Sequence, residues 1–287
     1  MIVQKIEINF QTKDASTMLV KSLQNLGFAI LNNHSINPLL IEEVHTGWQA
    51  FFAASIDEKN QYQCNKKTLD GYFPFGIEKT SYGKTQDFKE FFYFYAWGIC
   101  PENLREKTLL LHHELLDLGN KLLQIIDDSL PEKIKDRLSV PLRKMTTNTQ
   151  RAVLRILHYP PIPTNKEGVS RAIEHEDLTL ISIVNPIVGS GLQVKDHGGN
   201  WHCIPAGINR LVINIGDMLE LCSKKFYQAT THRVLNPGGE EANYSRYSNA
   251  FFLNPNDEIV LDKEKTAGDL LQTHINKKLE NYYDKFN

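Results

Sequence analysis

Apolar residues in the first half of the chain recur every three or four positions, the spacing of an amphipathic helix. This pattern runs through residues 17–26, 37–55 and 101–130. Asn37 and Pro38 are residue types preferred at the N-cap and the first position of a helix. Gly27 suits the residue after a helix end, and the FAILNN that follows favours a short strand. We therefore expect residues 1–149 to be mostly helical.

An aromatic-rich segment separates the second and third predicted helices. Residues 69–98 predict an ordered, irregular loop that leads into the strand EFFYFYAW. Because successive side chains of a strand point to opposite faces, Phe91 and Tyr93 share one face, and Phe92 and Phe94 share the other. The alternation does not decide which pair faces a pocket.

From about residue 150 the pattern changes to short runs of alternating apolar residues, such as AVLRILHY, LTLISIV, RLVINIG and RYSNAFFLN. Clusters of Gly, Pro and Asn separate these runs. Many short strands at regular spacing favour a sandwich or a jelly roll. Residues 266–286 predict a final helix.

The chain is expected to form one domain, because no Ser/Gly-rich linker divides its helical half from its strands. The predicted fold class is mainly β with α. A β core spans residues 150–262, and helices from residues 1–149 and from residues 263–287 flank it.

The composition, with 41% apolar and 23% charged residues, is that of a folded globular protein. A formal charge of −2 without long runs of like charge argues against a nucleic-acid partner. The four cysteines lack CxxC spacing, so we expect reduced thiols. The sequence shows neither a secretory signal nor an apolar run that could span a membrane. We expect a cytoplasmic protein, monomeric or weakly homo-oligomeric, without a membrane partner.

Two potential metal ligands stand at the head of the apolar run AIEHEDLTLISIV. If this run is one strand, His175 and Asp177 point to the same side. An isolated pair of this kind is more often a pair of surface residues. His232, on another predicted strand of the same β region, strengthens the metal interpretation. Two histidines and one carboxylate form the facial triad of non-haem Fe(II) oxygenases.

A second pair of residues repeats this spacing. Arg246 and Ser248 in RYSNAFFLN lie two apart on a predicted strand, so a guanidinium and a hydroxyl face one side. Such a pair suits a carboxylate held deep in a pocket. A surface arginine beside an exposed serine is the alternative.

Taken together, these motifs resemble the isopenicillin N synthase-like branch of the Fe(II)- and 2-oxoglutarate-dependent oxygenases. The resemblance covers LGFAILNNHSINPLLIEEV, the loop and strand of residues 71–94, the segment of residues 191–237 and the RxS motif. It implies a double-stranded β-helix, or jelly roll. It also implies that His175, Asp177 and His232 bind Fe(II), and that Arg246 and Ser248 bind the far carboxylate of 2-oxoglutarate.

Tyr159 falls where many members of this family have a tyrosine near the cosubstrate. Plant members have an asparagine two residues earlier, where this chain has Leu157. The tyrosine is therefore assigned to cosubstrate binding on the resemblance alone, at a corner where the chain departs from the plant pattern.

The implied activity is an oxidoreductase that consumes 2-oxoglutarate and O2, releases succinate and CO2, and hydroxylates or desaturates a small molecule. Related halogenases replace the carboxylate ligand with a small residue. This chain keeps Asp177, which favours hydroxylation, desaturation or ring closure over halogenation. One alternative is an iron oxidase that uses no 2-oxo acid and performs a cyclisation, as isopenicillin N synthase does. Another is a non-catalytic binding protein.

Substrate contacts are expected from residues 72–95 and from the C-terminal helix. Phe91 lies in the aromatic strand, and Phe252 shares the alternation of Arg246 and Ser248; for both, plain core packing is the alternative. Arg155 could meet an anionic substrate or be a surface charge on its strand. We take Arg155, Phe91 and Phe252 as candidate substrate residues.

Overall fold

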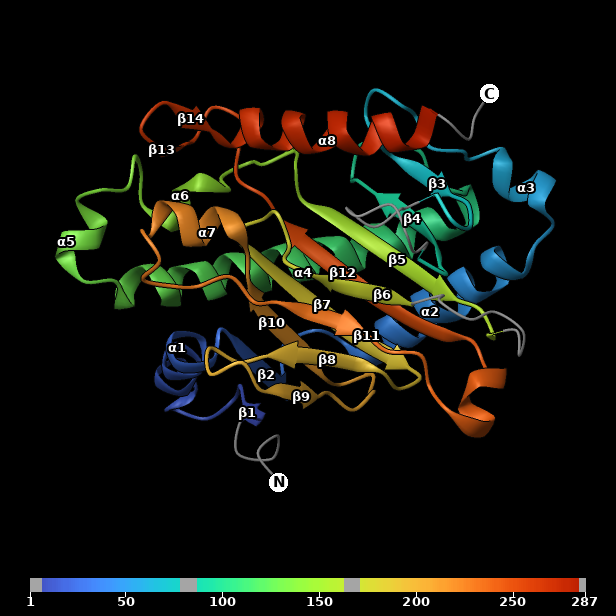
Figure 1. Cartoon of the computed structure of the whole chain (residues 1–287), viewed down its shortest axis with the longest axis horizontal. Coiled ribbons are helices and arrows are strands. Elements are labelled where there is room, and N and C mark those ends of the chain that lie inside the picture. Colours follow the sequence, from blue (N-terminus) through green and yellow to red (C-terminus); the bar gives the residue numbers. More distant parts are fainter. Residues whose placement is uncertain (1–6, 78–86, 163–170, 284–287) are drawn as a thin grey trace.

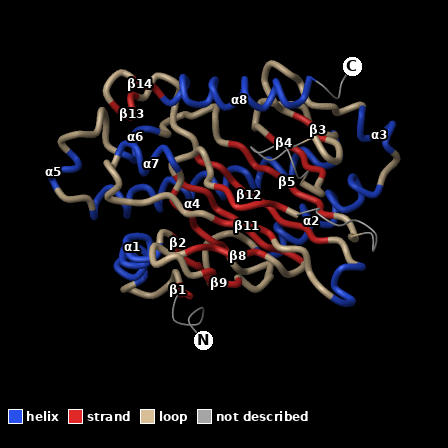
Figure 2. Tube along the Cα trace, in the orientation of Figure 1, coloured by secondary structure: helices blue, strands red, loops and turns tan. Residues whose placement is uncertain are grey.

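The computed structural model describes residues 7–77, 87–162 and 171–283. Strands lie at the centre of the molecule and helices lie around them (Figure 2). The major sheet has the strand order β1 (Glu7–Asn9), β2 (Phe28–Asn32), β10 (Leu211–Ile215), β7 (Ile181–Val188), β12 (Arg246–Leu253), β5 (Val153–Tyr159), β4 (Glu90–Phe94) and β3 (Gly71–Phe73). The minor sheet has the order β6 (Ala172–His175), β11 (His232–Val234), β8 (Leu192–Lys195) and β9 (Trp201–Cys203).

The helices lie around these strands (Figure 1). The longer ones are α1 (Ala15–Leu26), α2 (Pro38–Ala53), α4 (Glu102–Ser129) and α8 (Ala267–Tyr283). The shorter elements are α3 (Ile56–Asn60), α5 (Glu132–Lys135), α6 (Leu142–Met145), α7 (Asp217–Cys222), a 3-10 helix (Gly239–Asn243), and the paired strands β13 (Val260–Asp262) and β14 (Lys265–Thr266).

Local signals place the helix ends where the sequence predicts them. The Asn37 side chain accepts a hydrogen bond from the backbone N–H of Leu39 at the start of α2, and Pro38 is the first helical residue. At the end of α1, Gly27 adopts a left-handed conformation with φ of 82°. Both helix boundaries are confirmed.

Two apolar clusters divide the molecule into layers. On one face of the major sheet, α1, α2 and α4 pack against side chains that include Phe92, Phe94 and Phe251. On the other face, the minor sheet packs against side chains that include Phe91 and Tyr159. Two sheets that enclose one core, with helices outside, form the predicted jelly roll, so the fold class is confirmed.

Strand β4 shows how alternation separates these two layers. Phe91 and Tyr93 belong to the cluster between the sheets, whereas Phe92 and Phe94 pack against the helices. The sequence predicts which side chains share a face of the strand, but not which face meets the helices. The neighbouring strand decides which face this is, because Phe92 pairs with Ile156 and both side chains belong to the cluster that packs against the helices.

Candidate metal centre

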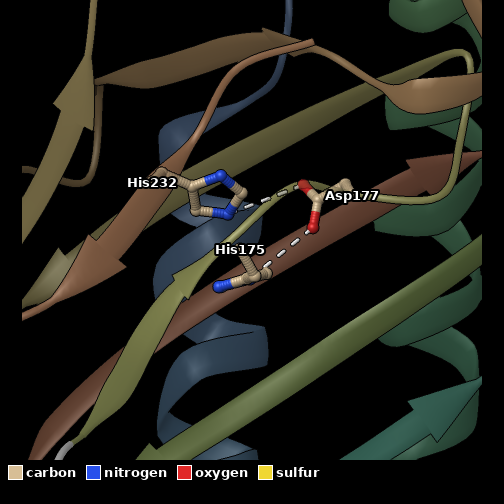
Figure 3. Close-up of side chains that lie close together, drawn as sticks. All are labelled: His175, Asp177 and His232. Carbon is tan, nitrogen blue, oxygen red and sulfur yellow. Dashed lines mark ion pairs between the residues drawn. The ribbon is translucent and has the colours of Figure 1, made fainter. Parts of the chain in front are cut away.

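Three side chains converge where the minor sheet meets the segment that leads into β7. His175 ends β6 and His232 begins β11, and the two residues are direct partners in the antiparallel pair. The Nε2 atom of His175 lies 3.8 Å from one carboxylate oxygen of Asp177, and that of His232 lies 3.7 Å from the other. Figure 3 shows the two imidazoles and the carboxylate pointing toward one another. Their ligand atoms all lie within 4.8 Å of each other.

The path of the chain through this site differs from the prediction. The run AIEHEDLTLISIV is not one strand, because β6 ends at His175 and β7 begins at Ile181 in the other sheet. Asp177 lies in the connection, where its backbone carbonyl accepts hydrogen bonds from the N–H groups of Thr179 and Asp217, at 3.0 Å each. The predicted convergence of His175 and Asp177 is therefore present, but a fixed turn produces it, and strand alternation does not.

Backbone carbonyls orient both imidazoles. Nδ1 of His175 donates to the Ile173 carbonyl at 2.8 Å, and Nδ1 of His232 donates to the Thr230 carbonyl at 3.1 Å. A carbonyl can only accept, so Nδ1 carries a proton in each ring, and Nε2 is the nitrogen that could bind a metal. Metal-binding histidines commonly have this second hydrogen bond.

The charge states of the cluster also suit a cation. Burial of the imidazole, and then the neighbouring His232, lower the pKa of His175 to about 3, although 39% of its side chain is exposed. Burial opposes ionisation of Asp177, but His232, His175 and Ser182 outweigh it and lower its pKa. The buried Oδ2 of Asp177 has no hydrogen-bond partner among the described residues. A neutral imidazole and an unsatisfied carboxylate oxygen fit a divalent metal.

Gly216 fixes the turn that carries Asp177. A Cβ at this position would lie 2.1 Å from the Thr179 carbonyl oxygen and 2.8 Å from that of Asp177. We expect Gly216→Ala to lower the free energy of unfolding by about 1–3 kcal/mol, because the backbone has to move. It should also weaken Fe(II) binding, measured by competition with a chelator. Gly238→Ala, at a glycine with no atom within 4 Å of the added carbon, is the control. Equal Fe(II) affinity in both variants would contradict this role.

The predicted carboxylate-binding pair lies on β12, on the face toward the minor sheet. Arg246 is 1% exposed, and its Nη1 donates to the Ser248 hydroxyl at 3.0 Å. Its guanidinium carbon lies 4.8 Å from the ring centre of Tyr159, which is its direct partner on β5. Leu157 stands where plant members of the resembled family have an asparagine, and it pairs with Ser248. The structure thus brings Arg246, Ser248 and Tyr159 together.

The three candidate substrate residues lie on the same inner face. The guanidinium carbon of Arg155 lies 3.8 Å from the ring centre of Phe91, and Arg155 is 8% exposed, so it is not a surface charge. Phe252 packs half-buried against the same cluster, opposite Val153. The positive charge of Arg155 contributes to the lowered pKa of Asp177.

Sequence reasoning missed Arg171. This residue precedes β6 and is 1% exposed, as buried as Arg246. Its backbone N–H donates to the Asn236 side chain at 3.0 Å, and its Nη2 donates to the Tyr244 carbonyl at 3.1 Å. No local pattern marks an arginine whose partners lie so far along the chain.

Comparison with known proteins gives two family matches. A model described as the N-terminal region of a non-haem dioxygenase in morphine synthesis matches residues 5–110, and that of the 2OG-Fe(II) oxygenase superfamily matches residues 150–255. Jasmonate-induced oxygenase 4 of Arabidopsis thaliana is 30% identical over 86% of this chain and 70% of its own length. The chain spans 62% of the length of jasmonate-induced oxygenase 1 from the same plant, with 27% identity.

Solved structures share the fold. A Shewanella oneidensis protein described as an oxygenase superposes with a TM-score of 0.84 and 37% identity, over 94% of this chain and 97% of that one. JOX2, solved in complex with 2OG, Fe and JA, superposes with a TM-score of 0.77 over 96% of this chain and 88% of that one. Its identity of 22% makes this second likeness one of fold alone.

Proposed function

Because the chain belongs to the 2OG-Fe(II) oxygenase superfamily, we propose that His175, Asp177 and His232 bind its Fe(II). The observation that supports this most strongly is the convergence of three ligand atoms within 4.8 Å, around a buried carboxylate oxygen without a hydrogen-bond partner in the described part of the chain. Two imidazoles and one carboxylate leave further coordination positions for small ligands.

The protein is an oxidoreductase that depends on Fe(II), 2-oxoglutarate and O2. These groups supply the oxidising power that hydroxylates or desaturates a small molecule as 2-oxoglutarate becomes succinate and CO2. The relatives do not support the alternative of an iron oxidase that uses no 2-oxo acid. The chain's own residues bind the reactants, orient them and exclude water.

Arg246 and Ser248 are the residues we assign to the far carboxylate of 2-oxoglutarate. The guanidinium is buried and already oriented by its hydrogen bond to the Ser248 hydroxyl. Tyr159 covers this guanidinium from the neighbouring strand, which keeps water from it. A buried guanidinium and a hydroxyl on one face provide charge-assisted hydrogen bonds for a carboxylate.

For the substrate we propose a small organic acid, with Arg155, Phe91 and Phe252 lining its site. Arg155 is a buried cation that lies on an aromatic ring of the inner face and acts electrostatically on Asp177. A carboxylate there would face the guanidinium, and the apolar body of the acid would contact the two phenylalanines.

We expect organic acids to stimulate succinate release more than their neutral methyl esters. Jasmonic acid, chosen because JOX2 was solved with JA, and its methyl ester form the first matched pair of probes. In Arg155→Gln the ratio of kcat/KM for the acid to kcat/KM for the ester should fall about tenfold or more, because a charge-assisted hydrogen bond is removed. Arg151→Gln, whose arginine pairs with Asp257, is the control. An ester as effective as the acid, for every acid tested, would contradict this substrate class.

We propose one domain over residues 1–287, a cytoplasmic location and a monomeric or weakly associated state, without a nucleic-acid partner. The four cysteines are free thiols, in keeping with a reducing compartment. In the described part of the chain, no helix is both long and apolar enough to cross a membrane.

A further inference from the structure

A second buried arginine lies beside the proposed cosubstrate site. Arg171 and Arg246 are both 1% exposed and belong to the largest fully buried side chains. The Arg171 guanidinium donates to the carbonyl of Tyr244, two residues before Arg246 on the chain. Arg171, the residue before β6 of the minor sheet, thus reaches the segment just before β12 of the major sheet.

The two guanidinium groups are close enough to repel each other. Burial, and then the positive charge of Arg246, lower the pKa of Arg171 to about 10, while Tyr159 and Glu241 act in the opposite direction. Arginine is not deprotonated in proteins, so both side chains are positively charged at neutral pH. Two buried cations therefore lie near each other beside the start of β12.

In the described part of the chain neither cation forms an ion pair, although Glu241 acts on Arg171 from a longer distance. Among the described residues, no acidic group lies within ion-pair distance of Arg171 or Arg246, and the Nε atom of each has no hydrogen-bond partner. By contrast, Arg143, Arg151 and Arg210 each pair with an acidic side chain. Leaving a buried charge unpaired is strongly unfavourable, so two such charges together indicate a site prepared for an anion.

We propose that Arg171 and Arg246 jointly bind the far carboxylate of 2-oxoglutarate, and that Arg171 makes this site selective for a dicarboxylic 2-oxo acid. The inference rests on the proposed role of Arg246 and Ser248. An ionised carboxylate accepts about four hydrogen bonds, which is enough for two guanidinium groups and the Ser248 hydroxyl. The alternative is that Arg171 only supports the Tyr244 carbonyl and so positions the start of β12.

The test compares two cosubstrates by calorimetry on the full chain loaded with Mn(II), without turnover. The probes are 2-oxoglutarate and 2-oxopentanoate, in which a methyl group replaces the far carboxylate. We expect Arg171→Gln to weaken 2-oxoglutarate binding by about 10-fold to 100-fold and to change 2-oxopentanoate binding by less than about twofold. Arg171→Lys should lose part of the preference, because lysine keeps the charge but not the planar fork.

Two further variants separate the possible outcomes. Arg246→Gln should also lose the preference for 2-oxoglutarate, and Arg210→Gln, at an arginine paired with Glu7, should keep it. If Arg246→Gln keeps the preference, the proposed cosubstrate site itself is wrong. Arg171 only supports β12 if Arg246→Gln loses the preference for 2-oxoglutarate while folded Arg171→Gln keeps it. The same conclusion holds if Arg171→Gln weakens the binding of both 2-oxo acids equally. Should Arg171→Gln fail to fold, an unchanged preference in Arg171→Lys would overturn the inference.

Discussion

Asp177→Ala is expected to abolish succinate release and to weaken Fe(II) binding by more than about 100-fold. Loss of a residue that only hydrogen-bonds to a metal ligand already weakens binding by up to about 100-fold, and Asp177 is proposed as a ligand itself. Asp177 is the one acid in the cluster, so its loss leaves two neutral imidazoles to hold a dication. Its carboxylate also stands 3.8 and 3.7 Å from the two Nε2 atoms, in the position that a shared metal requires.

The measurement is a competition between the protein and a chelator for Fe(II), with succinate quantified in parallel. Glu174→Ala is the matched control, because Glu174 is exposed on the same strand as His175. It should bind Fe(II) as the unmodified protein does. Retention of Fe(II) affinity in Asp177→Ala would show that the metal, if bound, is held elsewhere.

Glu90→Gln is expected to lower the free energy of unfolding by about 3–5 kcal/mol, the cost of breaking a buried ion pair on one side. Glu90 is 1% exposed, and its carboxylate accepts hydrogen bonds from Lys59 at 2.9 Å, from His158 at 2.7 Å and from the Tyr72 hydroxyl. The amide cannot neutralise Lys59, which is itself buried. Urea denaturation at neutral pH measures the difference.

The effect of Glu90→Gln should depend on pH in a definite direction. Burial opposes ionisation of Glu90, but hydrogen bonds from His158, Tyr72 and Lys59 outweigh it and lower its pKa. A lowered pKa in the folded state stabilises the protein above the unfolded value of about 4.3, and this stabilisation is lost as the pH falls. The difference between the two proteins should therefore shrink below about pH 4.

A surface pair gives the control for this experiment. Glu43 lies 2.7 Å from Lys107, with both side chains more than half exposed. Glu43→Gln should change the free energy of unfolding by less than about 1 kcal/mol, because water screens an exposed pair. Equal destabilisation by Glu43→Gln and Glu90→Gln would contradict the claim that the buried Glu90 cluster stabilises the fold more than an exposed pair does.

The Glu90 cluster also bears on the site. Glu90 and His158 are direct partners on β4 and β5, on the helical side of the sheet. Their neighbours in sequence, Phe91 and Tyr159, point to the inner side. The cluster therefore fixes two strands that carry residues of the proposed pocket. His158, which stands next to Tyr159 in the sequence, supports the site from behind and does not line it.

Features set by short-range chemistry were predictable from the sequence. The N-cap at Asn37 and the left-handed Gly27 depend on residues within one helical turn. Alternation on β12 places Arg246 and Ser248 on one face. His232 was correctly placed on a strand, and its pairing with His175 makes the cluster.

Features set by distant contacts were not predictable. The break between β6 and β7 depends on Gly216, whose close packing against Thr179 exists only once the sheets have assembled. The burial of Arg171 depends on Asn236 and Tyr244, which are remote in sequence. Periodicity in one strand contains no information about partners in another sheet.

The most direct test of the central claim is the conversion of 2-oxoglutarate to succinate by metal-free protein to which Fe(II) is added back in the presence of O2. We predict succinate and CO2 in equal amounts, none without Fe(II) or without O2, and none in His232→Ala, which lacks one of the three converging ligand atoms. Succinate formation that survives both a chelator and His232→Ala would contradict the assignment of the metal centre.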